Sequence, residues 1–210
     1  MGQCNYHYSK AVGGSWGIVG KGDSSMSKAG VFIDRDGVIN VNRSDYVKSW
    51  DDFVFESGIF EPLRCLAQNH LAIVVVSNQS AIGRGLVDRD TVDEIHSRMI
   101  EEITRNRGRI DGVYYCPHRP EDGCDCRKPR PGLLLRAAQE LNLDLCRSYF
   151  IGDTISDVEA ALAAGCMPLL VQTGLGTNQM PLLKEKGFER IRIFHNLKEV
   201  ADFILGIEAR

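Results

Sequence analysis

Short apolar segments alternate with helical patterns from residue 30 to the end of the chain. Strands are expected at residues 29–33, 71–77, 112–116, 148–152, 168–174 and 190–194. The second segment, LAIVVVS, is apolar on both faces, which is typical of a central parallel strand. The alternation predicts an α/β fold, a doubly wound parallel sheet with helices on both of its faces.

Helical spacing of apolar residues separates these strands. One helix is indicated by Ile59, Leu63 and Leu66, and Asp88 is placed to cap another with the apolar stripe Val92, Ile95, Met99 and Ile103. Further helices are expected at residues 132–142, 156–164 and 197–205. Gly165 should end the second of these three, because glycine adopts the left-handed conformation found after many helices.

The first 28 residues differ from the rest of the chain. They are rich in Gly and Ser and show no periodicity, so we expect residues 1–28 to be a poorly ordered extension and residues 29–210 to form one domain. The stretch GGSWGIVGKG lacks the order of glycines, lysine and hydroxyl residue that makes a phosphate-binding P-loop.

Charge and cysteine content narrow the class of protein. The net charge is −3 and the isoelectric point is near 6.0, which disfavours nucleic acid or an anionic membrane as the partner. No apolar run approaches the roughly 20 residues of a membrane span. Seven cysteines without a secretory signal indicate reduced thiols. We therefore expect a cytoplasmic protein, monomeric, acting on a small molecule.

Polar side chains follow four of the predicted strands, directly after three of them and beyond a cysteine-rich segment for the strand at 112–116. In chain order they are Asp34 and Asp36, Ser77 and Asn78, Arg127 and Lys128, and Asp153 and Asp157. Ligands of such sheets bind at the carboxyl ends of the strands. These acids, hydroxyls and bases are therefore expected to meet at one edge.

Carboxylates gathered in this way require a cation, because like charges repel strongly in a partly dry site. Oxygen ligands favour Mg²⁺, held by the side chains of Asp34 and Asp153 and the backbone carbonyl of Asp36. An EF-hand is the alternative for the spaced acids, but Gly37 stands at loop position four instead of six, and position twelve is Asp45 instead of Glu.

The same residue types suit phosphoryl transfer. Asp34 is the candidate nucleophile and Asp36 the candidate general acid and base, with Ser77 and Lys128 as stabilisers of the phosphoryl oxygens. Each signal alone has a structural explanation, such as a turn, a core serine or a helix cap. The order of all four groups, each after a strand, favours the catalytic interpretation.

The segment CPHRPEDGCDCRKP carries Cys116, His118, Cys124 and Cys126. Three thiolates and one imidazole satisfy tetrahedral Zn²⁺ without an open position, which indicates a structural site. Free thiols are the alternative, and disulfides are disfavoured in a reducing compartment. Arg127 and Lys128 follow directly, so the metal would orient both. Of the other four cysteines, those at positions 65, 146 and 166 are expected in the core. His70 and His96 are expected at the surface.

Four motifs, FIDRDGVIN, VVVSNQS, CRKPRPG and FIGDTISD, resemble those of the haloacid dehalogenase (HAD) superfamily over residues 29–205. Within it, DRDGVIN, NQSAIGRG and the Cys/His loop are similar to the D,D-heptose 1,7-bisphosphate phosphatases and the related histidinol-phosphatases. The resemblance implies a HAD-like Rossmannoid domain without a large cap. One departure is Thr154, where several heptose enzymes have lysine, and Thr154 is then available to cap the following helix.

The resemblance also implies a reaction. It is removal of the C7 phosphate from D-glycero-D-manno-heptose 1,7-bisphosphate through an aspartyl phosphate, in nucleotide-activated heptose biosynthesis for lipopolysaccharide core or a surface glycan. The implied substrate contacts are Asn42, Arg43, Ser44, Asp45, Ser77, Asn78, Gln79, Ser80, Arg84, Arg127 and Lys128. Histidinol-phosphate phosphatase activity, or a non-catalytic phosphate-binding module, remain the alternatives, and the anomer is open.

Overall fold

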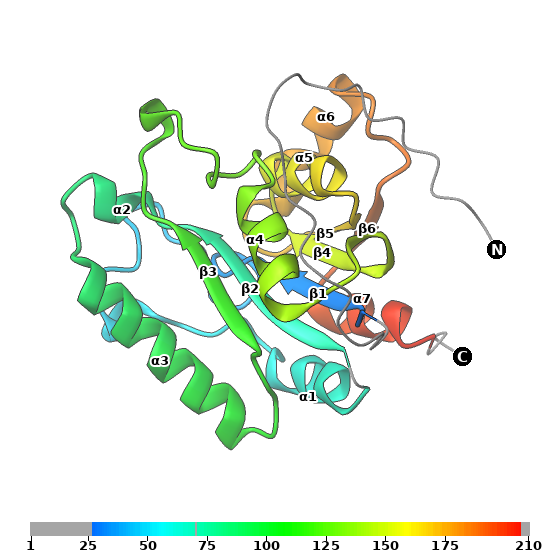
Figure 1. Ribbon diagram of the computed structural model, residues 1–210, viewed down its shortest axis with the longest axis horizontal. Helices are drawn as coiled ribbons and strands as arrows, with labels where there is room; N and C mark the ends of the chain where they lie inside the picture. The colour runs from blue at the N-terminus through cyan, green and yellow to red at the C-terminus, as the bar shows by residue number, and fades with distance from the viewer. Residues whose placement is uncertain (1–26, 70, 207–210) are drawn as a thin grey trace, which may run out of the picture.

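A parallel sheet of six strands forms the centre of the molecule in the computed structural model, which describes residues 27–69 and 71–206 (Figure 1). The strand order is β3-β2-β1-β4-β5-β6. The strands are β1 Gly30–Ile33, β2 Ala72–Asn78, β3 Gly112–Cys116, β4 Tyr149–Gly152, β5 Met167–Val171 and β6 Arg192–Phe194. The predicted α/β class is confirmed, while the predicted extension lies almost entirely outside the described residues.

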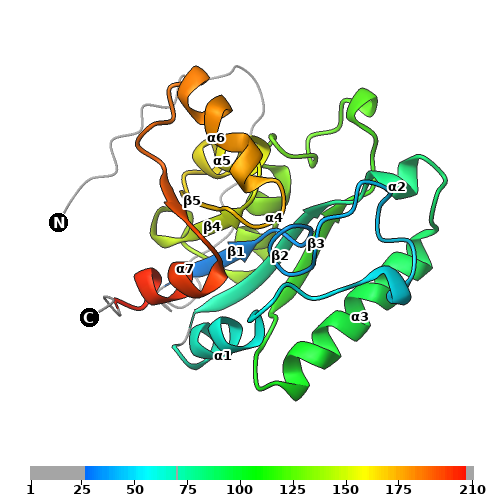
Figure 2. The same ribbon diagram turned by 180° about the vertical axis from the view of Figure 1, so that it is seen from behind.

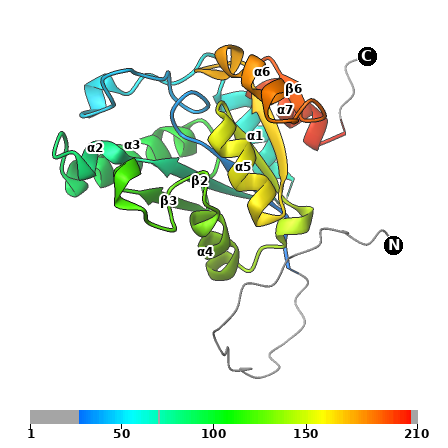
Figure 3. The ribbon, with the colours of Figure 1, turned by 90° about the horizontal axis from the view of Figure 1, so that it is seen from above.

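Helices cover both faces of this sheet (Figure 2, Figure 3). On one face α1 Phe60–Gln68, α3 Arg89–Arg105 and α7 Leu197–Ile204 share an apolar cluster with Val31 and Ile33 of β1. On the other face α4 Gly132–Leu141 and α5 Ile155–Ala164 pack on Phe32. Because successive side chains of a strand point to opposite faces, β1 contributes to both clusters. Among the described helices none is both long and apolar enough to cross a membrane.

Local signals set the ends of several helices as the sequence indicated. The Asp88 carboxylate accepts a hydrogen bond of 2.6 Å from the Thr91 amide at the start of α3. Gly165 ends α5 at a φ of 82°, a conformation that glycine adopts without steric penalty. Thr154 precedes α5, and its amide donates to Asp157 Oδ2 at 3.0 Å, as expected for a cap.

The segment after β5 differs from the sequence-based expectation. The strand ends at Val171 instead of residue 174, and α6 Gly176–Glu185 follows, a helix that was not predicted. Its signal was weak because it contains Pro181 and buries only Gly176 and Leu183. Leu183 packs with Ile155 of α5, so tertiary contacts support a helix that lacks a clear apolar stripe.

The strand order places one crevice at the centre of the sheet. β1 lies between β2 and β4, and the chain proceeds from these two neighbours toward opposite edges. Such a switch point separates the loops that leave adjacent strands at their carboxyl ends. The segments after β1 and β4 therefore face each other, and they carry Asp34 and Asp153.

Truncation of a core leucine should destabilise the domain strongly. Leu63 of α1 is completely buried, so we expect Leu63→Ala to lower the free energy of unfolding by about 2–5 kcal/mol through lost contacts and a cavity. Leu135→Ala in α4 is the control, because this side chain is 46% exposed. It should change stability by less than about 0.5 kcal/mol. Urea denaturation measures both, and equal losses would contradict the assignment of the core.

Candidate active site

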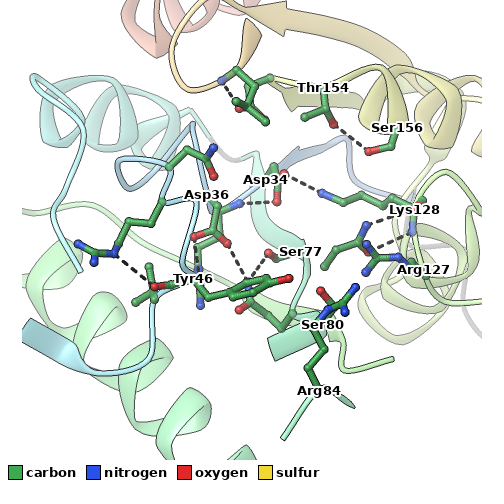
Figure 4. A pocket seen from close by; sticks show the side chains of 18 residues that line it. Asp34, Asp36, Tyr46, Ser77, Ser80, Arg84, Arg127, Lys128, Thr154 and Ser156 are labelled. Carbon is green, nitrogen blue, oxygen red and sulfur yellow. Dashed lines mark hydrogen bonds and ion pairs between the residues drawn. The ribbon is translucent and has the colours of Figure 1, made fainter. Parts of the chain in front are cut away.

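A pocket of about 330 Å³ opens at the carboxyl edge of the sheet (Figure 4). Its lining residues are Asp34, Arg35, Asp36, Asn42, Arg43, Tyr46, Val47, Ser77, Asn78, Gln79, Ser80, Arg84, Arg127, Lys128, Asp153, Thr154, Ser156 and Leu175. Most of the residues singled out from the sequence thus lie around one space. Ser44 and Asp45 do not line it, whereas Arg35, Tyr46, Val47, Thr154, Ser156 and Leu175 were not singled out as site residues.

The loop after β1 presents Asp34 to this pocket. The Asp34 amide donates to Ile151 O of β4 at 2.9 Å, and its Oδ1 accepts a bond of 2.7 Å from the Arg35 amide. Gly37 follows at a φ of 87°, and a Cβ atom there would lie 2.1 Å from Asp153 Oδ2. Only glycine permits this close approach of the loop to Asp153.

The loop after β5 closes over Asp153 from the other side. Leu175 donates its amide hydrogen to Asp153 Oδ2 at 2.7 Å, and a Cβ atom on Gly174 would lie 2.2 Å from the same oxygen. Thr173 Oγ1 donates to the Gly37 carbonyl at 2.7 Å. These contacts join the segments after β1, β4 and β5. The available sequence signal was the glycine pair in QTGLG, which the predicted strand at 168–174 obscured.

Lys128 lies at the centre of the acidic residues. Its ammonium is 2.9 Å from Asp34 Oδ2 and 2.7 Å from Asp157 Oδ1, and it donates to Val76 O at 3.1 Å. Asn78 holds its backbone from both sides, since Oδ1 accepts from Lys128 N at 3.1 Å and Nδ2 donates to Lys128 O at 3.2 Å. The lysine is therefore fixed in position and only 4% exposed.

The charges of this cluster do not balance. Burial raises the pKa of Asp34 to about 7, with a smaller contribution from Asp157, although Lys128 opposes the shift. Burial, Asp34 and Asp157 raise the pKa of Asp153 to about 8. Burial alone would lower the pKa of Lys128, but Asp157 and Asp34 outweigh it and raise that pKa. One ammonium faces three carboxyl groups, so further positive charge would stabilise their ionised forms.

Three carboxylates are arranged so that they could hold a metal ion. Oxygen atoms of Asp34, Asp153 and Asp157 all lie within 4.8 Å of one another. Oxygen-only ligands fit a hard divalent cation, and a cation here would supply the missing positive charge. Asp157 was not among the predicted ligands. Its signal was its place four residues after Asp153 at the start of a helix.

Asp36 points away from this cluster into a separate set of hydrogen bonds. Its Oδ1 accepts from Arg35 Nη2 at 2.9 Å and Asn40 Nδ2 at 3.0 Å, and its Oδ2 accepts from Gln79 Nε2 at 2.8 Å. Gln79 Nε2 also donates to Ser77 Oγ at 2.8 Å. Although burial raises the pKa of Asp36, the Arg35 guanidinium and these hydrogen bonds lower it below the ordinary value.

The expectation that His96 lies at the surface is wrong. The side chain is 4% exposed, and its Nε2 lies 3.2 Å from Arg35 Nη1. Burial and the Arg35 charge lower the pKa of His96 to about 3. The helical spacing in α3 was recognised, but a polar residue was not counted in its apolar stripe, and the partner of His96, Arg35, lies in a distant segment of the chain. His70 lies outside the described residues.

The loop between Asn42 and Tyr46 contributes to the wall of the pocket. Arg43 lines the pocket, and its Nε and Nη2 donate to the Asp45 carboxylate at 3.1 and 3.0 Å. Its Nε also donates to Tyr46 O at 3.3 Å. Asp45 thus contacts Arg43 instead of the pocket, and it orients the guanidinium.

The Cys/His cluster forms as the sequence indicated. Ligand atoms of Cys116, His118, Cys124 and Cys126 lie within 4.8 Å of one another. Cys124 Sγ is 3.5 Å from Cys116 Sγ and 3.4 Å from Cys126 Sγ. Sulfur ligands at about 2.3 Å around tetrahedral Zn²⁺ lie about 3.8 Å apart, so the separations of these residues are close to those that zinc requires. Of the other cysteines, Cys166 is buried as expected, but Cys65 is only partly buried and Cys146 is exposed, which corrects that expectation.

The Cys/His loop is tied to the pocket. Gln79 N donates to Cys116 O at 2.7 Å and Gly83 N to Pro117 O at 2.9 Å, which joins the loop to α2 Ser80–Gly83. Arg127 Nη1 donates to the His118 carbonyl at 3.4 Å. When the Cys/His loop is ordered, these contacts therefore also fix Arg127 and the backbone of Gly83, the residue before Arg84.

Asp153→Asn should stabilise the magnesium-free protein at pH 8. The raised pKa of about 8, against an ordinary 3.8, means that the folded protein retains a proton that the unfolded chain has lost. Stability from this proton is fully present below about pH 4 and is lost as the pH rises through about 8. Asparagine removes the charge, so we expect the unfolding free energy at pH 8 to rise by at least about 1.4 kcal/mol, the value of one pKa unit.

Urea unfolding after dialysis against magnesium-free buffer, at pH 5 and pH 8, measures this effect. Asp51→Asn, an exposed aspartate outside the cluster, is the control and should leave stability unchanged at both pH values. A variant less stable than wild type at pH 8, or a gain of equal size at pH 5, would contradict the prediction.

Comparisons with known proteins agree with this geometry. The family model described as HAD-hydrolase-like matches residues 125–200. A D-glycero-beta-D-manno-heptose-1,7-bisphosphate 7-phosphatase of Pseudomonas aeruginosa is 38% identical over 180 residues, which cover 86% of this chain and 99% of the relative. A D-glycero-alpha-D-manno-heptose-1,7-bisphosphate 7-phosphatase of Campylobacter jejuni is 39% identical, over 85% of this chain and 96% of the relative.

A solved structure shows the same similarity in three dimensions. The crystal structure of D,D-heptose 1,7-bisphosphate phosphatase from B. bronchiseptica, complexed with magnesium and phosphate, superposes with a TM-score of 0.80 at 37% identity. The match covers 85% of this chain and 99% of that one. Extended identity and a shared fold confirm the resemblance found in the motifs. The chain belongs to the HAD-like D-glycero-D-manno-heptose-1,7-bisphosphate 7-phosphatase family.

Proposed function

We propose that this protein is a magnesium-dependent phosphatase that removes the C7 phosphate from D-glycero-D-manno-heptose 1,7-bisphosphate. The observation that carries the proposal is the placement of the Asp34 carboxylate, 2.9 Å from the Lys128 ammonium, at the base of a pocket that Asp36 also lines. The family to which the chain belongs supplies the substrate class. The reaction would serve nucleotide-activated heptose biosynthesis in the cytoplasm, in a monomer.

The first half-reaction forms a phosphoenzyme. An oxygen of Asp34 attacks the C7 phosphorus, the bond from phosphorus to the sugar oxygen breaks, and Asp36 protonates the leaving alcohol. Asp36 is ionised in the free protein, and the approaching phosphate dianion raises its proton affinity as any neighbouring negative charge does. Lys128 and Ser77 stabilise charge on the phosphoryl oxygens.

The second half-reaction releases phosphate. Asp36 removes a proton from water, the water oxygen attacks the phosphorus, and the Asp34 carboxylate is restored as inorganic phosphate leaves. Magnesium held by the side chains of Asp34 and Asp153 and the backbone carbonyl of Asp36 would neutralise charge on the phosphoryl group when bound. Asp157 orients Lys128 throughout, because their ion pair of 2.7 Å is buried.

Cationic and polar groups around the pocket entrance select the substrate in this proposal. Arg127 would bind the second phosphate, since guanidinium matches phosphate oxygens in a bidentate manner. Arg84 lies on the same side of the pocket as Arg127 (Figure 4), and Arg43 also lines the pocket. Asn42, Gln79 and Ser80 line the pocket and would contact the sugar. Asp45 and Ser44 would act through the orientation of Arg43.

The substrate is tested by a comparison of four compounds. We expect kcat/KM for the alpha or the beta anomer of the heptose bisphosphate to exceed that for histidinol phosphate and heptose 7-phosphate by at least about 100-fold, because only the bisphosphate engages Arg127. Asp34→Asn, which cannot form the phosphoenzyme, should lose at least about 10³-fold in kcat while it retains the fold. Preferred turnover of histidinol phosphate would overturn the substrate assignment, and near wild-type activity of Asp34→Asn would contradict the covalent route.

A structural zinc ion in the Cys/His cluster is part of the same proposal, and its loss should weaken substrate binding. The loop contains few apolar residues, so the metal would supply its ordering energy. Cys124→Ala should lose about one equivalent of zinc by elemental analysis and raise KM for the bisphosphate about tenfold, because Arg127 loses its position. Cys65→Ala, outside the cluster, should keep both zinc and KM. Unchanged KM in protein verified to lack zinc would refute this coupling.

A further inference from the structure

Arg35 is among the largest side chains that the described chain buries completely, at 1% exposed. It follows Asp34 directly, yet its guanidinium forms an ion pair with Asp36, whereas Lys128 pairs with Asp34 and Asp157. Its Nη2 donates to Asp36 Oδ1 at 2.9 Å, its Nη1 lies 3.2 Å from His96 Nε2, and the Phe53 ring centroid lies 6.0 Å from its Cζ. Among the described residues, Arg35 Nε has no hydrogen-bond partner. The guanidinium therefore depends on two hydrogen bonds for its orientation.

The contact between Arg35 and His96 determines the protonation state of the His96 ring. Guanidinium donates hydrogen bonds and accepts none, so His96 Nε2 must be the acceptor and the proton of the neutral ring must be on Nδ1. Burial and the neighbouring arginine both favour that neutral ring. The Asp36 carboxylate, beyond Arg35, is the charge of opposite sign in this network.

The position of His96 within α3 makes this acceptor rigid. Its ring packs 5.2 Å from the ring of Tyr115 on β3. Tyr115 in turn donates to Asp93 Oδ1 of α3 at 2.5 Å. Two elements, α3 and β3, thus fix the acceptor, so that Arg35 cannot turn without loss of its hydrogen bond to His96.

We propose that His96 is a positioning residue for catalysis, which acts through Arg35 to hold the Asp36 carboxylate toward the pocket. The proposal rests on the proposed function in one respect, that Asp36 exchanges protons with the leaving group and water. Without an acceptor at position 96, the buried guanidinium rotates to satisfy Nη1 elsewhere, and Asp36 loses its cationic partner. Asn40 and Gln79 still bond to Asp36, so the site loosens without collapse.

Two substitutions at position 96 separate positioning from packing. His96→Leu fills the space but removes the acceptor, and His96→Gln supplies an amide oxygen that accepts from Arg35. We expect His96→Leu to lower kcat by at least about tenfold with KM within about twofold, since the residues that bind phosphate are untouched. His96→Gln should retain kcat within about threefold of wild type. His195→Leu, a histidine with a 77% exposed side chain, is the control and should leave both constants unchanged.

A kcat for His96→Leu within twofold of wild type, or an equal loss of kcat in the Leu and Gln variants, would overturn the proposal. A rise in KM that accounts for the whole loss of kcat/KM would also overturn it. The rates are measured with whichever phosphate monoester the wild type hydrolyses. If the wild type hydrolyses another phosphate monoester but not the heptose bisphosphate, the proposed substrate is refuted. The His96 variants can still be compared with the monoester that is hydrolysed.

Nitrogen-15 NMR of the imidazole rings in the wild-type protein gives a readout independent of activity and of the folding of any variant. We expect the His96 ring to remain neutral, with its proton on Nδ1, between pH 5 and pH 8. An imidazolium at His96 at pH 6, or a proton on Nε2, would overturn the proposal.

Discussion

The buried ion pairs of Lys128 with Asp34 and Asp157 are the interaction on which the candidate site depends. An ammonium removed from water is costly unless it is paired and hydrogen-bonded, and here two carboxylates and the Val76 carbonyl surround it. Asp153 lies beside these pairs, and its burial, together with the charges of Asp34 and Asp157, raises its pKa to about 8. The excess of carboxyl groups over cations means that a divalent ion among Asp34, Asp153 and Asp157 would stabilise their ionised forms.

Backbone packing provides the second constraint, because the acids are brought together by loops from different strands. Gly37 and Gly174 approach the Asp153 carboxylate so closely that a Cβ atom on either would overlap it. The Thr173 hydroxyl joins the loop after β5 to the loop after β1 through the Gly37 carbonyl. Main-chain contacts thus hold the carboxylates close together although their charges repel one another. The rigid loops at the sheet edge oppose this repulsion.

Two separate parts of the structure hold Arg127 and Asp36 in position: the Cys/His loop and helix α3. The Cys/His loop fixes Arg127 through the His118 carbonyl and α2 through Pro117, so its order reaches the substrate side of the pocket. On the opposite face of the sheet, α3 presents His96 to Arg35 and thereby to Asp36. Asp34, the proposed nucleophile, is held by Lys128, and Asp36, the proposed proton-transfer group, is held by Arg35. The two carboxylates therefore have independent supports, although only one residue separates them in the chain.

The sequence by itself determined the parallel sheet, the helix ends at Asp88 and Gly165, the Cys/His cluster and the polar residues after each strand. These features follow from local periodicity, from the conformations that caps and glycine prefer, and from the rule that parallel strands gather their carboxyl ends. Only the tertiary structure decided that His96 is buried, that Asp157 pairs with Lys128 and that α6 follows β5. The reason is physical: these outcomes depend on contacts between distant segments, such as Thr173 with Gly37 at a separation of 136 residues, which no local pattern of polarity encodes.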